Sequence, residues 1–485
     1  MPITKLLEQA RAAAEQTECV DPFYQPEYHF SAPRGWMNDP NGLVRFRGEY
    51  HLFYQYYPYA AHNGVSHWGH AKSRDLIRWE HLPVALAPDM PYDRDGCWSG
   101  GAMQVGDRLY LIYTGNCEGA PRNQTQNLAV SDDGLNFEKF AGNPVITADS
   151  APAGVDRRDF RDPFVWEQNG NYYCLIGTLC SGVPTALVYR SSDFCAWEYA
   201  GVFLQRRNSG YCYECPNFAS LGGKDLLLLS PVDFPADGLH FRNRSSVVCS
   251  LGKFSERTGA FEGGPFAEVD AGTDFYATQL VRTADGRTVL LAWMNMWDRT
   301  QVTQELGHGW QGMCTFPREI WEENGALMQR PVGELTDCEH GEIAAECELS
   351  GERRFEGVSG RAIRLRLEAD VRSCRTFGIR LMEGDGKYLL AQYDCSEEIF
   401  TLDRRNTLHP IKGSAREQEG FRKVRYACGG TLTLDILLDR CSAEFFFGRG
   451  ELAMSMLVYN GAGDGVTFWA DGCAHVRIRK SEISV

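Results

Sequence analysis

A recurring pair of β-rich runs is the feature of this sequence that most limits its fold. In each unit, a run rich in β-branched and aromatic residues meets a glycine-containing turn and a second such run follows. The unit occurs five times, at Leu43–Tyr54, Ala102–Tyr113, Phe164–Ile176, Phe218–Leu229 and Leu280–Met294. The turn glycines are Gly48, Gly106, Gly170, Gly222 and Gly286, which are 58, 64, 52 and 64 residues apart. One unit cannot bury its own apolar faces, so the repeat indicates sheets arranged radially around one axis.

A second repeated motif has nearly the same spacing as the hairpins. A serine–aspartate turn begins at Ser73, Ser131 and Ser192, and each turn is followed by an aromatic residue, at Trp79, Phe137 and Trp197. These aromatic positions are 58 and 60 residues apart. A period of about 50 to 65 residues is typical of four-stranded propeller blades, and five units predict a five-bladed β-propeller.

The pattern changes near Pro331. Beyond it, alternating polar and apolar runs such as Ala362–Leu367 and Leu432–Leu438 are separated by polar turns, which predicts a sandwich-like β domain. Before the first hairpin, residues 3–16 have the pattern of a short amphipathic helix. We therefore predict an all-β chain with three parts: an N-terminal helical extension (1–23), a five-bladed β-propeller (24–335) and a C-terminal β-sandwich (336–485).

Charge and composition exclude several classes of function. Lys and Arg number 49 against 64 Asp and Glu, and the net charge of −15 is the wrong sign for binding nucleic acid. Charged residues interrupt the first 16 positions where a secretory signal would be apolar, and no apolar run approaches the roughly 20 residues that span a bilayer. The 17 cysteines are scattered without paired spacings. We expect a cytoplasmic protein with reduced thiols and with neither a nucleic-acid nor a membrane partner.

Three acidic residues occupy equivalent places in the repeat. They lie in WMNDPNG (36–42), FRDP (160–163) and YECP (213–216). Asp39, Asp162 and Glu214 precede the turn glycine of their own units by 9, 8 and 8 residues. Equivalent positions on the innermost strands of a propeller face one axial channel, so we expect the three carboxyl groups to converge.

Carboxylates that share a pocket repel one another, which is unfavourable unless chemistry uses their charge. Glycosyl transfer is such chemistry, because a retaining glycosidase needs one carboxylate as nucleophile and one carboxylic acid as proton donor, roughly 5 to 5.5 Å apart. A single Asp-Pro pair is more often a turn former than a catalytic group. Three acids in phase favour catalysis over that structural explanation.

The same motifs resemble the three signatures of glycoside hydrolase family 32, the invertases and fructan hydrolases. Further similar motifs follow in order: FYQ at 53–55, HWGHAKSRDLIRWEHLPVALAP at 67–88, WSG at 98–100, DFYATQ at 274–279 and TFPRE at 315–319. The resemblance implies a five-bladed propeller with a C-terminal β-sandwich, and a retaining β-fructofuranosidase that hydrolyses the terminal β-D-fructofuranosyl bond of sucrose and related short fructosides. It implies no metal and no organic cofactor, only a small carbohydrate substrate.

Residue roles follow from the same resemblance. Asp39 would be the nucleophile, Glu214 the general acid and then base, and Asp162 a transition-state stabiliser that binds fructose hydroxyls beside Arg161. The remaining fructose-pocket positions implied are Asn38, Gln55, Trp68, Trp98, Ser99 and Asp274.

Three alternatives stay open. The leading helix and the missing signal resemble intracellular sucrose-6-phosphate hydrolases, and a phosphate would need cations such as those in the loops, Arg122, Arg157, Arg158, Arg206 and Arg207. A propeller could also bind fructan without hydrolysing it. An inverting arabinan-type hydrolase would need its carboxyl groups about 6.5 to 9.5 Å apart, and WMNDPNG argues against it. The sequence leaves open whether the chain forms a homo-oligomer.

Two local features bear on the site. The loop after Tyr57 contains His62, Asn63 and Gly64, and we expect it to rim the pocket and to influence the leaving group. Cys212 and Cys215 flank Glu214, where a thiol would raise local apolarity and favour the protonated acid.

Overall fold

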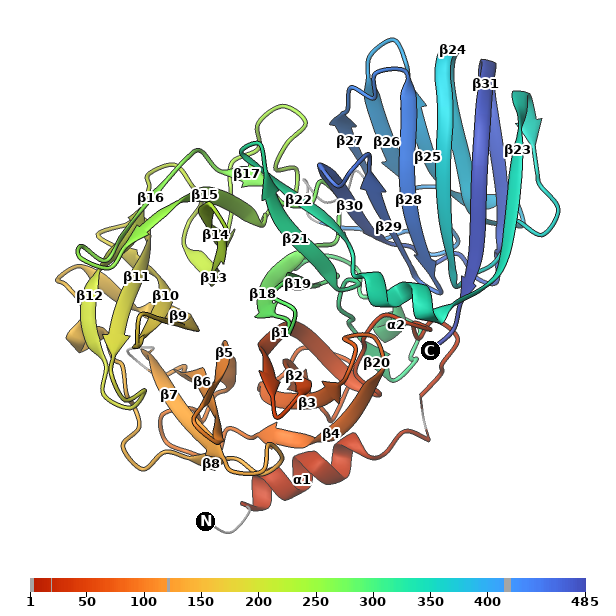
Figure 1. Cartoon of the computed structure of the whole chain (residues 1–485). Coiled ribbons are helices and arrows are strands. Elements are labelled where there is room, and N and C mark those ends of the chain that lie inside the picture. The colour runs from red at the N-terminus through yellow and green to blue at the C-terminus, as the bar shows by residue number, and fades with distance from the viewer. Residues whose placement is uncertain (1–3, 19, 120–122, 414–419) are drawn as a thin grey trace.

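The computed structural model describes residues 4–18, 20–119, 123–413 and 420–485. It confirms a five-bladed β-propeller followed by a β-sandwich (Figure 1). Each of the five predicted units forms the first hairpin of one blade, so each blade begins on its innermost strand. The five turn glycines have φ angles between 58° and 90°, a region that glycine enters without steric cost.

The blades follow one another along the chain. The first contains β1 (Gly35–Phe46), β2 (Glu49–Tyr57), β3 (His67–Ser73) and β4 (Trp79–Leu86). The second contains β5 (Cys97–Val105), β6 (Arg108–Cys117), β7 (Asn123–Ser131) and β8 (Glu138–Lys139). The third contains β9 (Val155–Gln168), β10 (Asn171–Cys180), β11 (Val183–Ser191) and β12 (Glu198–Gln205), with the short helix η1 (Ala148–Ser150) before it.

The last two blades complete the ring. The fourth contains β13 (Tyr213–Leu221), β14 (Lys224–Pro231), β15 (Val248–Ser255), β16 (Ala260–Gly263) and β17 (Ala267–Glu268). The fifth contains β18 (Tyr276–Arg282), β19 (Thr288–Trp293), β21 (Arg318–Glu323) and β22 (Ala326–Pro331). Between β19 and β21 the chain leaves the fifth blade, forms α2 (Val302–Glu305) and then β20 (Trp310–Gln311), which pairs in parallel with β1. Backbone hydrogen bonds therefore link the end of the propeller to its beginning.

The serine–aspartate motif is the turn between the third and fourth strands of a blade. The hydroxyls of Ser73, Ser131 and Ser191 donate to the aspartate two residues further along the chain at 3.0, 2.8 and 3.0 Å. Each of these aspartates also accepts backbone N–H groups, so the turn closes on its own side chain. In the third blade the serine is Ser191, one position before the predicted Ser192.

The C-terminal β-sandwich is built around two long strands. Its elements after η2 (Gly333–Cys338) are β23 (Glu339–Arg353), β24 (Ile363–Gly384), β25 (Lys387–Asp394), β26 (Ile399–Asp403), β27 (Phe421–Arg425), β28 (Thr431–Asp439), β29 (Ser442–Phe447), β30 (Leu452–Leu457) and β31 (Gly465–Ile483). β24 pairs with β28 along residues 363–370 and with β25 along residues 376–384, while β31 follows it throughout. The alternating pattern predicted here points apolar side chains into one buried core.

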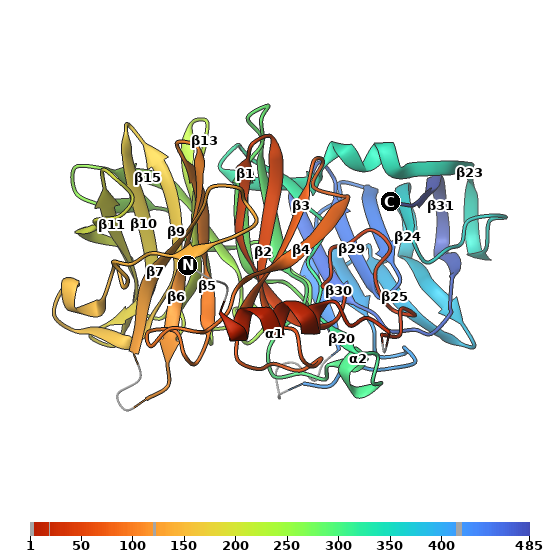
Figure 2. The same ribbon diagram turned by 90° about the horizontal axis from the view of Figure 1, so that it is seen from below.

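The predicted N-terminal helix is α1 (Lys5–Ala14), which is shorter than the 3–16 span. The Thr4 side chain caps it by accepting from the Leu7 N–H group. Leu7 and Ala10 are buried, and the Arg11 side chain donates to the Val84 carbonyl of β4 at 3.0 Å. The helix therefore packs along the outer edge of the first blade (Figure 2).

Among the residues that the structure describes, no helix is long and apolar enough to cross a membrane. The sixteen cysteines in these ranges are free thiols.

A buried ionic network joins the two domains. Arg318 of β21 donates to Asp270 at 2.9 Å and to Glu444 of β29, and none of these three side chains is exposed. His29 lies between Asp439, at 2.8 Å from its Nδ1, and Glu444, at 2.9 Å from its Nε2. Burial lowers the pKa of His29, but the hydrogen bonds to these two carboxylates outweigh it and raise the pKa to about 9. The histidine is therefore a cation near neutral pH.

This ionisation predicts a pH-dependent stability. Because the folded pKa of His29 lies above the usual 6.5, its stabilisation is complete below pH 6.5 and is lost as the pH rises through 9. The difference in pKa corresponds to on the order of 3 kcal/mol. In urea titrations, the unfolding free energy of the wild type should fall between pH 6.5 and 9 relative to that of His29→Gln. Exposed His62→Gln should track the wild type; parallel curves for wild type and His29→Gln would refute the assignment.

Candidate active site

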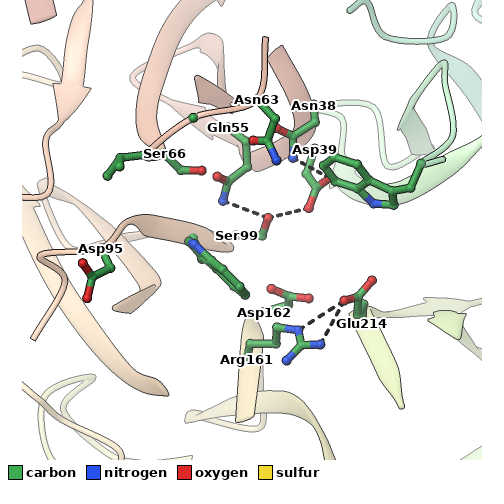
Figure 3. Close-up of a pocket in the computed structure, with 14 residues that line it drawn as sticks. Asn38, Asp39, Gln55, Asn63, Ser66, Asp95, Ser99, Arg161, Asp162 and Glu214 are labelled. Carbon is green, nitrogen blue, oxygen red and sulfur yellow. Dashed lines mark hydrogen bonds and ion pairs between the residues drawn. The ribbon is translucent and has the colours of Figure 1, made fainter. Parts of the chain in front are cut away.

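The three acids converge on one pocket, as their phase in the repeat predicts (Figure 3). The pocket has a volume of about 460 Å³. It is lined by Asn38, Asp39, Gln55, Asn63, Gly64, Val65, Ser66, Asp95, Trp98, Ser99, Arg161, Asp162, Glu214 and Trp297. Asp39 comes from β1, Asp162 from β9 and Glu214 from β13, which are the innermost strands of the first, third and fourth blades.

A β-bulge at the same level of every innermost strand shapes this pocket. Between residues 37 and 40 of β1, the strand advances three residues while its partner advances two. The same one-residue excess occurs at 98–100 of β5, 161–164 of β9, 214–217 of β13 and 276–279 of β18. A bulge bends the strand and redirects a side chain that regular pleating would turn away. Asp39, Ser99 and Asp162 lie within these bulges.

The prolines of the acidic motifs belong to these bulges. Pro40, Pro163 and Pro216 each lie in or at the end of a bulge. Proline has no N–H group to donate to a regular ladder, so within a sheet it is tolerated at bulges. Asp162 and Cys215 accordingly have positive φ angles of 61° and 43°. The Asp-Pro and Cys-Pro pairs are thus part of the backbone geometry that presents the acids.

Two side chains donate to Asp39, and a third holds one of them. The Ser99 hydroxyl donates to Asp39 Oδ2 at 2.6 Å, and the Asn38 amide donates to Oδ1 at 3.0 Å. Gln55 in turn donates to the Ser99 hydroxyl at 3.1 Å. Burial raises the pKa of Asp39 and the charge of Glu214 adds to the rise, whereas the hydrogen bonds from Ser99 and Asn38 oppose it; the net shift is upward. These donors orient the carboxylate and stabilise its ionised form.

Both oxygens of Glu214 have partners. Arg161 donates to Oε1 through Nη2 at 3.0 Å and through Nε at 3.3 Å. The Tyr276 hydroxyl lies 2.7 Å from Oε2 and 2.9 Å from the Ser230 carbonyl. Because the tyrosine has one proton, it can donate to the Glu214 carboxylate, or donate to Ser230 and accept from a protonated Glu214. The contact is therefore compatible with both protonation states of the acid.

The pKa of Asp162 is raised above its usual value. The Cys215 N–H group donates to its Oδ2 at 3.0 Å. Burial raises the pKa of Asp162, the Arg161 cation lowers it, and the charges of Glu214 and Asp39 raise it further, to about 7. A carboxyl group with this pKa beside two other acids is typical of an active site.

Arg161 connects the acids to a second layer of residues. Its Nη1 donates to Asp159 at 2.7 Å and to Gln124 at 3.1 Å, while its other nitrogens face Glu214. Tyr211 donates to the other Asp159 oxygen at 2.8 Å, and the guanidinium lies 5.9 Å from the Trp98 ring centre. Arg161 is thus shared between two carboxylates and held in place by both.

Two of the predicted pocket residues lie elsewhere. Trp68 is fully buried in the packing between the first two blades, and its indole N–H donates to the Trp98 carbonyl at 3.1 Å. Asp274 is fully buried at the junction with the sandwich, where it binds Arg299, Arg404 and the Leu457 N–H group. The prediction that these two side chains line the pocket is wrong, because Trp68 packs between two blades and Asp274 binds two arginines between the domains.

The flanking cysteines and the loop arginines also differ from expectation. The Cys215 thiol lies 3.7 Å from carboxylate oxygens of Asp39 and Asp162, so it contacts these acids instead of Glu214. The Cys212 sulfur accepts from Arg161 at 3.5 Å. The four loop arginines that the structure describes do not line the pocket: Arg157 and Arg158 pair with Asp149 and Asp156, and Arg206 and Arg207 line a separate cavity. Arg122 lies outside the described residues.

Sequence reasoning missed part of the pocket wall. Asn63 and Gly64 line it, as the loop prediction states, while His62 does not. The sequence did not identify Asp95 or Trp297, whose ring is tilted against that of Trp293 with ring centres 4.8 Å apart. Neither belongs to a repeated motif or to a predicted strand, so only proximity to the WSG motif could have indicated Asp95.

Comparison with known proteins identifies the family of this chain. The model of the glycosyl hydrolases family 32 N-terminal domain matches residues 29–331, and that of the family 32 C-terminal domain matches residues 335–484. The chain is a glycoside hydrolase and belongs to family 32.

The names of its relatives refer to sucrose and related sugars. The chain is 35% identical to a sucrose-6-phosphate hydrolase of Escherichia coli over 447 residues, covering 90% of this chain and 89% of that one. It is 36% identical to an E. coli raffinose invertase over 451 residues, covering 90% of each. Among solved structures it resembles a mutant of a Bombyx mori GH32 beta-fructofuranosidase in complex with sucrose, with a TM-score of 0.87, 32% identity and coverage of 100% and 99%.

The Tyr276–Glu214 contact generates a prediction. Tyr276→Phe removes a hydrogen bond to a charged group, a contact generally worth about 1.5 to 3 kcal/mol, so we expect kcat to fall at least tenfold with little change in KM. Steady-state kinetics with sucrose measures both constants. Tyr199→Phe, an exposed tyrosine on β12, serves as the matched control and should retain wild-type kinetics. Unchanged kcat for Tyr276→Phe would show that the hydroxyl does not support Glu214.

Proposed function

We propose that this protein is a retaining β-fructofuranosidase that hydrolyses the terminal β-D-fructofuranosyl bond of sucrose and related short fructosides. The observation that carries the proposal is the meeting of Asp39, Asp162 and Glu214, from three separate blades, in one pocket. Each carboxyl group has a different set of donors, which suits three different roles. Membership of family 32 and the fructofuranosidase in complex with sucrose support the choice of substrate.

In the first step, an Asp39 carboxylate oxygen attacks the anomeric C2 of fructose. The bond between C2 and the glycosidic oxygen breaks, and Glu214 gives its proton to that oxygen, so the leaving sugar departs with a hydroxyl. In the second step, the Glu214 carboxylate takes a proton from water while the water oxygen attacks C2. The bond to Asp39 breaks, its carboxylate is restored, and two inversions produce net retention.

The surrounding residues suit the charges that form and disappear in these two steps. Ser99 and Asn38 donate to Asp39 and hold it for in-line attack. Asp162, at the buried end, accepts hydrogen bonds from fructose hydroxyls and stabilises the positive charge that develops at the sugar ring. Arg161 keeps Glu214 oriented while the acid changes its protonation state. Trp98 and Trp297 supply apolar wall against the sugar.

A second candidate function is hydrolysis of sucrose 6-phosphate. The name of the E. coli relative favours it, because that protein is 35% identical over most of both chains. The related raffinose invertase, at 36% identity, favours unphosphorylated substrates equally. The cytoplasmic location stays a prediction of the sequence.

Retention can be tested by trapping the first intermediate. In water containing methanol, a retaining enzyme transfers the fructosyl group to methanol as methyl β-D-fructofuranoside, whereas an inverting enzyme gives the α anomer. NMR of the product from sucrose should show the β anomer. Asp39→Asn, which keeps the size of the side chain, should lower kcat by at least 10⁴-fold and serves as the blank. The α anomer, or activity of Asp39→Asn near that of the wild type, would contradict the mechanism.

The proton donor can be tested with the leaving group. Glu214→Gln cannot protonate the glycosidic oxygen, so hydrolysis of sucrose should fall on the order of 10³-fold. A p-nitrophenyl fructoside needs little protonation because its leaving group is a stable phenolate, and its cleavage should fall far less. Equal losses in kcat for the two substrates would remove Glu214 from the role of acid.

A further inference from the structure

The pocket has a closed end and an open end. Gln55, Ser99 and Asp162 are 3%, 4% and 6% exposed, and they surround the place where the fructosyl bond would break. Asp95 and Val65 are 36% and 46% exposed. A terminal fructosyl group must enter first and be enclosed, so the leaving sugar occupies the open end. Residues there contact the part of the substrate that differs between sucrose and its relatives.

Asp95 lies at this open end, across the pocket from Glu214. Figure 3 shows Asp95 and Ser66 on the opposite side of the pocket from Glu214, with Asp162 between Asp95 and Glu214. The Ser66 carbonyl accepts from the Cys97 N–H group at 2.9 Å, so the loop of residues 63–66 is tied to the segment that carries Asp95. One wall of the leaving-group site is therefore built from this loop and Asp95.

The backbone and carboxylate of Asp95 are held by neighbouring groups. Its N–H group donates to the Asn116 carbonyl at 3.1 Å. Its Oδ2 accepts from the Glu118 N–H group at 2.8 Å and from Arg94 Nε at 3.3 Å. The residues that the structure describes supply no donor to Oδ1, which is available to accept a hydrogen bond from a sugar hydroxyl.

The charge around the pocket opposes an anionic leaving group. Four carboxyl side chains line it, and in the described part of the chain Arg161 is the one cation among its lining residues. That cation is already bound to Glu214 and Asp159. A phosphate ester carries about −1.5 to −2 charges at pH 7, so at the open end it would be repelled by Asp95, which lines the pocket, whereas the Arg94 cation paired with it does not. Sugar hydroxyls carry no charge and can donate to it.

We propose that Asp95 is a specificity-determining residue that accepts a hydrogen bond from the leaving sugar and disfavours a phosphorylated one. The enzyme then prefers sucrose and other neutral fructosides to sucrose 6-phosphate. This inference rests on the proposed β-fructofuranosidase function, because it concerns the same pocket. The charge of the pocket, and not the name of a relative, favours sucrose over sucrose 6-phosphate as the substrate.

Comparison of sucrose, raffinose and sucrose 6-phosphate separates the effect of the leaving group's charge from the effect of its size. Raffinose carries a neutral galactosyl group on the glucose oxygen that carries phosphate in sucrose 6-phosphate. We expect kcat/KM of the wild type to be more than tenfold higher for sucrose, and also higher for raffinose, than for sucrose 6-phosphate at low ionic strength. Added salt should narrow the gap between sucrose and its phosphate, because partly exposed charges are screened.

Asp95→Asn removes the charge and keeps one oxygen, which can still accept from the Glu118 N–H group, while its NH2 group takes the place of Oδ1. It should narrow the ratio of kcat/KM between sucrose and sucrose 6-phosphate at least threefold. Asp107→Asn, an exposed carboxylate on the β5–β6 turn, is the matched control and should leave the ratio unchanged.

The outcomes are distinguishable. Preference of the wild type for sucrose 6-phosphate, or an unchanged ratio in Asp95→Asn, would overturn the assignment while leaving the β-fructofuranosidase intact. Raffinose cleaved as poorly as sucrose 6-phosphate would show that size, not charge, limits the leaving group, which also overturns it. Absence of fructose release from all three substrates would refute the proposed function itself, and the assignment would fall with it.

Discussion

The site depends on one extra residue in each of five strands. A regular innermost strand turns alternate side chains toward the axis and leaves no room for three acids with separate partners. The bulges at one level of β1, β5, β9, β13 and β18 break that alternation and bring Asp39, Ser99 and Asp162 to the pocket. The positive φ angles of Asp162 and Cys215 are part of this geometry. Local strain of this kind persists because five sheets packed around one axis hold the backbone in place.

The propeller and the sandwich share buried charges, and this explains residues that look functional in the sequence. Asp274 belongs to a motif of the family, yet its carboxylate binds Arg299 and Arg404 where the domains meet. Arg318 similarly joins Asp270 to Glu444. Breaking a buried pair by removing one partner generally costs about 3 to 5 kcal/mol, so such residues are sensitive to substitution without contacting substrate. A loss of activity at these positions would report folding and not chemistry.

Scarcity of positive charge gives the pocket its chemical character. Arg161 is divided between Asp159 and Glu214, so the remaining carboxyl groups rely on neutral donors: Ser99 and Asn38 for Asp39, and the Cys215 N–H group for Asp162. Neutral donors stabilise a carboxylate without cancelling its charge, and the negative field that remains suits a transition state with positive charge on the sugar ring. The same field disfavours an anionic leaving group at Asp95.

The sequence by itself determined the number of blades, the strand that opens each blade and the three acids. These follow from a period near 60 residues and from the constant offset between each acid and its turn glycine, since equivalent positions in a repeat must occupy equivalent places around an axis. Only the tertiary structure decided which motif residues reach the pocket. Trp68 and Asp274 have the right motifs, but their side chains pack between blades and between domains. Trp297 and Asp95 have no motif and line the pocket from the segments between β19 and α2 and between β4 and β5. Periodicity encodes position along a strand; the direction of a side chain at a bulge, and the path of a loop, depend on contacts with segments distant in the chain.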